Sequence, residues 1–333
     1  MPSPSPEPVV RPVGLAVIGL GVIGRRMLEQ AALSPALRVV GAWDIDAAAC
    51  QRAQADFPDT VIAADARALM QAAGVDLVYI GTPPAFHRDY CLMAADLGRH
   101  VFCEKPLTAR LEEARLLVTE LNARATPNAV NFVFASAPAA DYLAARLADG
   151  SLGDIAAIEM RIFFSQWPRA WQASAQWLRL REQGGFVREV LSHFVYLSLR
   201  LFGDCRLVGS QVIWPADPSL CERAASALLN CAGIPATLSA ASGASGPDEV
   251  VYTVRGSRGA LRLTNWYEVE ESDGQAWRPV VLPADSSGDP RTAAYQRQLA
   301  NLVCFARGQP HPLPDAGIAL QVQTVIEGIV SVP

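Results

Sequence analysis

Short apolar runs alternate with helix-forming stretches through the first third of this 333-residue chain. The sequence predicts strands over residues 14–20, 38–43, 76–80, 100–103 and 129–134, and helices over 22–33, 47–55, 66–73, 88–97 and 111–125. Strands joined through a helix lie parallel, because the crossover packs back on the sheet with one handedness. The pattern therefore predicts an α/β fold with a doubly wound parallel sheet that helices cover on both faces.

A glycine-rich turn joins the first predicted strand to the first predicted helix. Its glycines are Gly19, Gly21 and Gly24, and Val22 and Ile23 stand between the last two. The first glycine permits a tight turn, the second lets a pyrophosphate approach the backbone, and the third allows close contact between helix and strand. Amides at the start of the helix would hold the phosphates. We therefore expect a Rossmann domain that binds a nicotinamide dinucleotide.

Asp44 stands 20 residues beyond Gly24, at the end of the second predicted strand. A carboxylate there accepts hydrogen bonds from both ribose hydroxyls of the adenosine and repels a 2′-phosphate. Capping of the next helix is an alternative role for Asp44, but Asp46 fits that role better. The sequence thus favours NAD as the cofactor, with NADP as the less favoured alternative.

Beyond about residue 135 the pattern changes to longer alternating segments. Strands are predicted over 155–164, 206–214, 225–231, 236–241, 250–255 and 260–265, and helices over 139–148, 186–202, 292–307 and 316–329. This order is typical of an α+β domain with a mainly antiparallel sheet. We expect a disordered leader over 1–12, the dinucleotide-binding domain over 13–134 and a second domain, for the substrate, over 135–333.

Composition narrows the class of protein further. Half of the residues are apolar, fewer than a fifth are charged and the formal net charge is −5, so the sequence offers no basic stripe for nucleic acid. The seven cysteines are scattered without a CxxC pair, which fits free thiols better than a disulfide framework or a zinc site. The proline-rich start has no apolar signal core. We expect a cytoplasmic protein without a membrane anchor or a bound metal.

Only one of the 28 basic residues is a lysine, Lys105. It stands between Glu104 and Pro106, directly after the predicted strand 100–103, so it should project at the carboxyl edge of the sheet, where α/β sheets bind ligands. A compact ammonium there can donate a hydrogen bond to a reacting oxygen or move a proton. The alternative is chance placement on the surface, where most lysines lie.

The mostly apolar helix 186–202 carries a carboxylate and an imidazole on one face. Glu189 and His193 are four residues apart, and such a pair is a plausible proton-transfer unit, because the carboxylate orients a ring that titrates near neutral pH. An ordinary hydrogen-bonded histidine is the alternative. His87, which starts a helix, either approaches the nicotinamide or caps that helix.

Three tryptophans, Trp167, Trp171 and Trp177, precede the helix 186–202. They either stack on a sugar ring or belong to the core, and a core role is the more common one for tryptophan.

Taken in order, these motifs resemble the glucose–fructose oxidoreductase, inositol dehydrogenase and rhizopine-catabolism family (Gfo/Idh/MocA). The resemblance covers nearly the whole chain after the leader. It rests on GLGVIG at 19–24, Asp44, GTPPAFH at 81–87, EKP at 104–106, GSLGDI at 150–155, Glu189 with His193, and LPDAGIALQVQ at 313–323. The ordered set is specific for the family, though not for the substrate.

The resemblance implies a Rossmann domain and an α/β domain whose open sheet often forms the dimer face, and so a homodimer or homotetramer. It implies hydride exchange between a nicotinamide and a carbinol or carbonyl, usually of a sugar or polyol. Lys105 would hold the reacting oxygen and His193 would act as general acid and base, with Glu189 as partner of His193. Two departures from the family pattern are Glu189, where aspartate is frequent, and Asn131, which many members follow closely with an arginine.

The remaining expected site residues fall into two groups. At the cofactor, beside the glycine-rich turn and Asp44, we expect Thr82, Pro83, His87, Glu104 and Lys105, and at the substrate Arg188, Tyr196 and Trp171.

Two other functions stay open at this point. A reductase of a non-sugar imine or ketone would use the same cofactor, and the tryptophans are compatible with it. A non-catalytic dinucleotide-binding sensor would need neither Lys105 nor His193, so the presence of both favours an enzyme.

Overall fold

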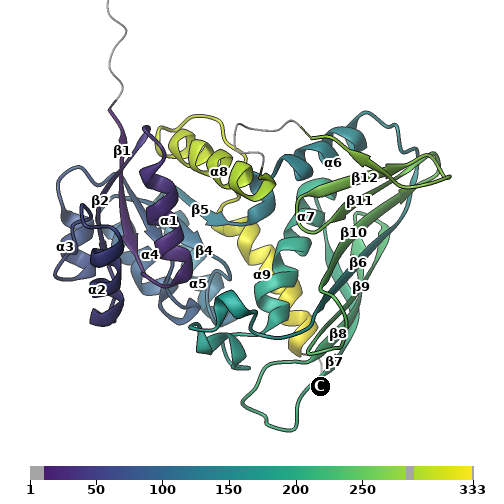
Figure 1. The fold of residues 1–333 in the computed structure, drawn as a ribbon, viewed down its shortest axis with the longest axis horizontal. Coiled ribbons are helices and arrows are strands. Elements are labelled where there is room, and N and C mark those ends of the chain that lie inside the picture. The colour runs from purple at the N-terminus through teal and green to yellow at the C-terminus, as the bar shows by residue number, and fades with distance from the viewer. Residues whose placement is uncertain (1–10, 283–288, 332–333) are drawn as a thin grey trace, which may run out of the picture.

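A five-stranded parallel sheet forms the N-terminal half of the computed structural model, which describes residues 11–282 and 289–331 (Figure 1). The expected leader over 1–12 therefore lies almost wholly outside the described residues. The strand order is β2-β1-β3-β4-β5 and every pair is parallel. The strands are β1 (Val13–Ile18), β2 (Leu37–Trp43), β3 (Leu77–Ile80), β4 (His100–Glu104) and β5 (Asn128–Asn131). The expected doubly wound sheet is confirmed.

Helices connect these strands, as the alternating pattern predicts. They are α1 (Val22–Ala32), α2 (Ala47–Asp56), α3 (Ala66–Gln71), α4 (His87–Asp96) and α5 (Leu111–Ala123). All residues of β1 and β3 are buried, as expected for parallel strands with both faces covered. The chain leaves β1 for one side of the sheet and β3 for the other. The carboxyl ends of these two strands therefore form the switch point at which such sheets bind ligands.

An eight-stranded sheet forms the second half, in the order β13-β12-β11-β10-β6-β9-β8-β7. Every pair is antiparallel except β6 with β9. The strands are β6 (Ile155–Phe164), β7 (Arg206–Ile213), β8 (Ala224–Cys231), β9 (Ile234–Ser242), β10 (Glu249–Gly256), β11 (Ala260–Thr264), β12 (Glu268–Ser272) and β13 (Arg278–Val280). The mainly antiparallel sheet that the sequence predicts is confirmed.

Helices cover one face of this second sheet. Residues of β8 and β9 alternate between buried and exposed, which is the pattern of strands with one face in the core. Figure 1 shows α6 (Pro138–Ala148), α7 (Ser192–Phe202) and α9 (Ala316–Ser331) on the side that faces the parallel sheet. The opposite face carries none of these helices.

The last two helices return to the N-terminal half. α8 (Pro290–Ala306) packs on α1, and α9 packs on α5, α7 and β5. The Val130 amide donates to the Pro314 carbonyl at 2.8 Å, which ties the chain before α9 to strand β5. Figure 1 shows α9 between the two sheets. The chain therefore crosses between the halves more than once, and the boundary near residue 134 stays a prediction.

The structure differs from the expected elements in three places. The strand predicted over 129–134 ends at Asn131, and a 3-10 turn over Val133–Ala135 follows. The helix predicted over 186–202 begins with a π-helical segment over Val187–Leu191. Strands β12 and β13 were not predicted, because their charged sequences EVEES and RPV lack the apolar alternation of a half-buried strand.

Two further observations concern the cysteines and the helices. All seven cysteines are free thiols, as the sequence predicts. No helix among the described residues is long and apolar enough to cross a bilayer.

Candidate active site

A cleft of about 200 Å³ opens at the carboxyl ends of β1, β3, β4 and β5. Segments from both halves of the chain form its walls, so the switch point of the parallel sheet faces the second domain. Its lining residues are Ile23, Arg26, Gly81, Thr82, Glu104, Lys105, Asn131, Val133, Arg169, Trp171, Trp177, Glu189, His193, Trp266, Tyr267, Arg291, Ala294, Tyr295 and Gln298.

The three glycines of the turn after β1 have three different surroundings. Gly19 has φ +94°, and a Cβ there would lie 2.6 Å from the carbonyl carbon of Gly81. A Cβ on Gly24 would lie 1.8 Å from the Gly19 carbonyl oxygen, so the turn and α1 are in contact. A Cβ on Gly21 would meet nothing within 4 Å. The turn is therefore closed on the protein side and open at Gly21, as a dinucleotide requires.

Helix α1 has free amides at its start. Gly21 precedes it and no side chain of the described residues caps it, so the first amides remain available to an anion. Val22 begins this helix, and Ile23 lines the cleft.

Asp44 closes the turn from the adjacent strand β2. Its Oδ2 accepts from the Leu20 amide at 2.6 Å and its Oδ1 accepts from the Asp46 amide at 2.8 Å. Asp46, in turn, caps α2 by accepting from the Ala48 amide at 2.9 Å. The capping role therefore belongs to Asp46, and the oxygens of Asp44 keep lone pairs for further donors.

The loop after β3 presents an unsatisfied hydroxyl. Thr82 lines the cleft, and its buried Oγ1 has no hydrogen-bond partner among the described residues. Because a buried polar atom is rarely left without a partner, this hydroxyl is available to a ligand in the cleft. Pro83 follows it and precedes the 3-10 turn Pro84–Phe86.

His87 lies behind this loop and does not line the cleft. It is fully buried, with Nε2 at 2.7 Å from the Thr82 carbonyl and Nδ1 at 2.9 Å from the Pro106 carbonyl. The ring thus ties the loop after β3 to the loop after β4. His87 thus contacts the backbone behind the cleft and does not line it, which differs from the expected approach to the nicotinamide.

Lys105 lies at the end of β4 and is 7% exposed. Its ammonium forms an ion pair with the Glu189 carboxylate and donates to the Glu189 backbone carbonyl at 2.6 Å. The other carboxylate oxygen of Glu189 accepts from Gln172 at 3.1 Å. The sequence correctly places Glu189 near His193 at the cleft, but its partner here is Lys105. A charged ammonium binds a carboxylate more strongly than a neutral imidazole does.

Glu104 belongs to the wall beneath Lys105. Its Oε1 accepts from the Tyr79 hydroxyl at 2.7 Å and from the Asn131 amide at 2.6 Å. Burial raises the pKa of Glu104, while these two hydrogen bonds act in the opposite direction. Asn131 also accepts from Gln298 of α8, so this network fixes the ends of β4 and β5 against the C-terminal helix.

His193 lines the cleft at the start of α7, one helical turn after Glu189. Its Nδ1 is 3.4 Å from the Val133 amide, and its ring packs edge-on against Trp266 at 5.7 Å between ring centres. Burial lowers the pKa of His193 well below its usual value, and the positive charges of Lys105 and Arg169 lower it further. The imidazole is therefore neutral at pH 7.

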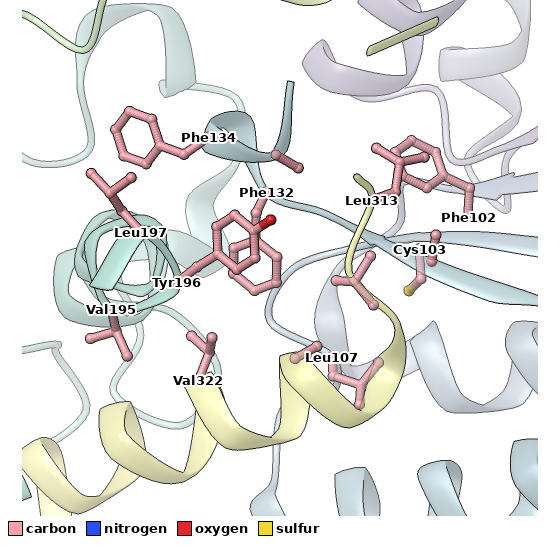
Figure 2. Packing of buried hydrophobic residues seen from close by; sticks show 14 of the residues in the cluster. Phe102, Cys103, Leu107, Phe132, Phe134, Val195, Tyr196, Leu197, Leu313 and Val322 are labelled. Atoms are coloured by element: carbon pink, nitrogen blue, oxygen red, sulfur yellow. The ribbon is translucent and has the colours of Figure 1, made fainter. Parts of the chain in front are cut away.

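The three expected substrate residues have different environments. Trp171 lines the cleft and is 39% exposed. Arg188 points away and forms a buried double hydrogen bond with Glu327 of α9, at 2.7 and 2.8 Å. Tyr196 stacks on Phe132 inside the core, at 4.7 Å between ring centres (Figure 2). Only Trp171 is thus placed to touch a ligand in the cleft.

Several cleft residues were not expected from the sequence. They come from α1, the turn after β11 and α8, and they are Arg26, Trp266, Tyr267, Arg291, Tyr295 and Gln298. Arg26 could have been predicted from the sequence, because it follows Ile23 by one helical turn and lies on the same face of α1. The others reach the cleft only through the tertiary fold.

Comparison with known proteins matches both halves of the chain to one oxidoreductase family. Residues 13–132 match the model of an oxidoreductase family with an NAD-binding Rossmann fold, and residues 141–262 match the model of the GFO/IDH/MocA C-terminal domain. The chain is 28% identical over 301 residues to the dTDP-3,4-didehydro-2,6-dideoxy-alpha-D-glucose 3-reductase of Streptomyces violaceoruber, a match that spans 86% of this chain and 85% of the relative.

Two further similarities are more limited. The chain is 34% identical over 99 residues to the 1-carboxy-3-chloro-3,4-dihydroxycyclo hexa-1,5-diene dehydrogenase of Comamonas testosteroni, which is 30% of this chain and 25% of that protein. The structure of a levoglucosan dehydrogenase, in complex with NADH and levoglucosan, matches with a TM-score of 0.84 over 96% of each chain at 18% identity. This structural likeness concerns the fold. The matched segments, the fold and the glycine-rich turn agree, and the chain belongs to the GFO/IDH/MocA family of NAD-binding oxidoreductases.

Proposed function

We propose that this protein is an NAD-dependent oxidoreductase that exchanges a hydride with a carbinol or carbonyl carbon of a sugar-like or polyol substrate. The observation that carries the proposal is the meeting of Lys105, Glu189 and His193 in the cleft at the switch point of the Rossmann sheet. Relatives whose names include a sugar 3-reductase and a dehydrogenase of a dihydroxylated ring support the same chemistry. We keep the expected domain boundary at 134 and 135 as part of this proposal, because residues from both sides of it line the cleft.

The residues that would hold the cofactor surround the start of α1. Gly21 leaves the backbone open, Asp44 presents its carboxylate beside the turn, and Thr82 offers a free hydroxyl. Asp44 places negative charge beside the expected adenosine ribose, which favours NAD over the 2′-phosphate of NADP. When bound, the nicotinamide supplies or accepts the hydride.

His193 serves as the group that exchanges the hydroxyl proton. Its lowered pKa keeps the ring neutral near pH 7, the form that accepts a proton when a carbinol is oxidised. The Val133 amide donates to Nδ1 at 3.4 Å, which is longer than the usual range of about 2.7–3.2 Å.

Lys105 stabilises negative charge on the reacting oxygen. Its ammonium is buried at the end of β4 and held by the Glu189 carboxylate and carbonyl. A fixed positive charge in a site of low water content stabilises an oxygen that becomes negative far more than the same charge in water would. Glu189 is then the positioning residue of Lys105.

The test measures NADH formation across sugars, sugar acids and inositols, and NADH consumption with the matching ketones. We expect His193→Ala to lower turnover by about 100- to 10,000-fold and Lys105→Met by about 100- to 1,000-fold. NADH affinity, read from NADH fluorescence, should change far less than turnover, because neither side chain belongs to the glycine-rich turn. Lys105→Met with Glu189→Met removes both charges together and controls for an unpaired buried carboxylate.

Each outcome has one meaning. Turnover that both single variants abolish supports the oxidoreductase and names its substrate class. Variants that turn over like the parent would refute the assigned roles. NADH binding without turnover on any substrate, together with NADH-dependent binding of a protein partner, would favour a sensor, and turnover confined to imines or non-sugar ketones would favour the other reductase.

A further inference from the structure

Three arginines from distant parts of the chain meet in the cleft. Arg26 comes from α1, Arg169 from the loop after β6 and Arg291 from the first turn of α8. Within residues 11–282 and 289–331, none of the three forms an ion pair with a carboxylate. The two cleft carboxylates already have other partners, Glu189 with Lys105 and Gln172 and Glu104 with Tyr79 and Asn131.

Trp171 brings two of these guanidinium groups together. The Cζ of Arg169 lies 4.8 Å from its ring centre and the Cζ of Arg26 lies 5.3 Å from the same centre. Stacking on an indole face leaves the edge of a guanidinium, which carries the donors, free for a ligand. Both guanidinium groups therefore lie against the Trp171 ring in the cleft wall.

Arg169 is further oriented by its neighbours. Its Nε donates to Gln172 at 3.0 Å, and Gln172 in turn binds Glu189. The two terminal nitrogens of Arg169 make no hydrogen bond with the described residues. A fork held in place with both terminal nitrogens free is the geometry that binds a carboxylate or a phosphate through two parallel hydrogen bonds.

The charge balance of the cleft is positive. Its lining includes four basic side chains, Lys105 and the three arginines, against two carboxylates, Glu104 and Glu189, a net of +2 (4 − 2). The whole chain has a net charge of −5, so this is a local excess. Burial is the largest effect on the pKa of Arg169 and lowers it. The positive charges of Arg291 and Arg26 lower this pKa further, whereas the carboxylates of Glu189 and Asp248 raise it. An anionic ligand would relieve this repulsion.

We propose that the substrate carries an acidic oxygen group, a carboxylate or a phosphate, which Arg169 and Arg26 bind beside Trp171 while its carbinol or carbonyl faces Lys105 and His193. This inference rests on the proposed function and narrows the substrate to acidic sugars. Trp171, Trp177 and Trp266 line the same cleft and supply flat apolar faces for the C–H side of a sugar ring.

The experiment compares matched probes on the parent protein and on Arg169→Gln and Arg26→Gln. The probes are D-glucose, D-glucuronate and glucose 6-phosphate, and each is measured by turnover with NAD and by calorimetric binding in the presence of NADH. Arg115→Gln, an exposed side chain on α5, is the matched control for loss of one positive charge. Thermal unfolding and NADH affinity of each variant show whether the fold and the cofactor site are intact.

We expect an acidic probe to bind at least about tenfold more tightly than glucose. Arg169→Gln and Arg26→Gln should each weaken that binding by about tenfold to a hundredfold, while Arg115→Gln and the affinity for NADH stay unchanged. A preference for glucuronate identifies a carboxylate, and a preference for glucose 6-phosphate identifies a phosphate. Weaker NADH binding in both variants would overturn the inference and assign the arginines to the cofactor.

Failure of the inference differs from failure of the proposed function. Glucose that binds and reacts as well as both acidic probes, with turnover that still needs Lys105, overturns the acidic substrate and keeps the oxidoreductase. Arginine-dependent binding of an acidic probe without any turnover keeps the anion site and counts against the proposed function.

Discussion

Two substitutions to alanine in the same turn should have opposite effects. Gly24→Ala places a Cβ 1.8 Å from the Gly19 carbonyl oxygen, whereas ordinary contact begins at 3.4 Å, so α1 and the turn must separate by 1.6 Å (3.4 − 1.8). The Gly19 carbonyl is backbone and the backbone of α1 fixes the position of the Cβ, so no flexible side chain can yield. Gly21→Ala places its Cβ in open space, at φ −66°, which alanine adopts freely.

The expected magnitudes follow from this geometry. Overpacking of this kind lowers the free energy of unfolding by about 3 kcal/mol at the upper end of its usual range. Alanine in place of glycine within a helix raises the same free energy by about 1 kcal/mol. Gly24→Ala should therefore lose about 2 kcal/mol, or about 4–8 °C in Tm at about 2–4 °C per kcal/mol. Gly21→Ala should keep its Tm or gain slightly, since alanine restricts the unfolded chain.

For cofactor affinity, unlike stability, Gly21→Ala should have the larger effect of the two substitutions. The methyl group of Gly21→Ala occupies the space through which a pyrophosphate would approach the backbone, so NADH affinity should fall by about tenfold or more. Thermal unfolding without cofactor and fluorescence titration with NADH measure the two effects separately. A Gly24→Ala protein as stable as the parent would refute the rigid contact, and a Gly21→Ala protein with parental NADH affinity would refute the placement of the dinucleotide over this turn.

Three further predictions test individual side chains. Burial lowers the pKa of His193 well below its usual value, so the proton-accepting ring persists as the pH falls, and kcat/KM for oxidation should stay level from about pH 8 to about pH 6; a kcat/KM that falls to half near pH 6.5 would contradict this. Arg188→Met leaves Glu327 buried without its partner and should cost about 3–5 kcal/mol in unfolding free energy with NADH affinity unchanged, and a second change, Glu327→Leu, should restore most of it. Tyr196→Phe should leave KM, kcat and Tm unchanged, because the Tyr196 ring stacks on Phe132 away from the cleft; a raised KM would return this residue to the substrate site.

The parallel sheet and its ligand edge could be predicted because their signals are local. Apolar runs buried on both faces, as in β1 and β3, are visible in the sequence, and parallel strands must bring their carboxyl ends to one edge. That rule alone places Gly21, Thr82 and Lys105 together, although they are far apart in the chain. The hairpin β12–β13 has no such signal, because its charged strands pair through backbone hydrogen bonds that the side chains do not reveal.

Side-chain partners within the site could not be predicted in the same way. Helical spacing places Glu189 and His193 on one face, and both line the cleft. Spacing within one helix cannot show that Lys105, 84 residues away in the chain, lies closer to the carboxylate. The same limit applies to Arg188, whose partner Glu327 comes from the last helix.

The position of the last two helices explains why these side-chain partners could not be predicted from the sequence. Helices α8 and α9 return from the end of the chain to pack on α1, α5 and β5, and through them Arg291 and Gln298 reach the cleft. A side chain takes the strongest partner that the folded chain brings near it, and a full charge exceeds a neutral ring. Local pattern therefore predicts which residues reach the edge of the sheet. The charge brought there by other elements determines their partners, and in this cleft that charge is an excess of arginine.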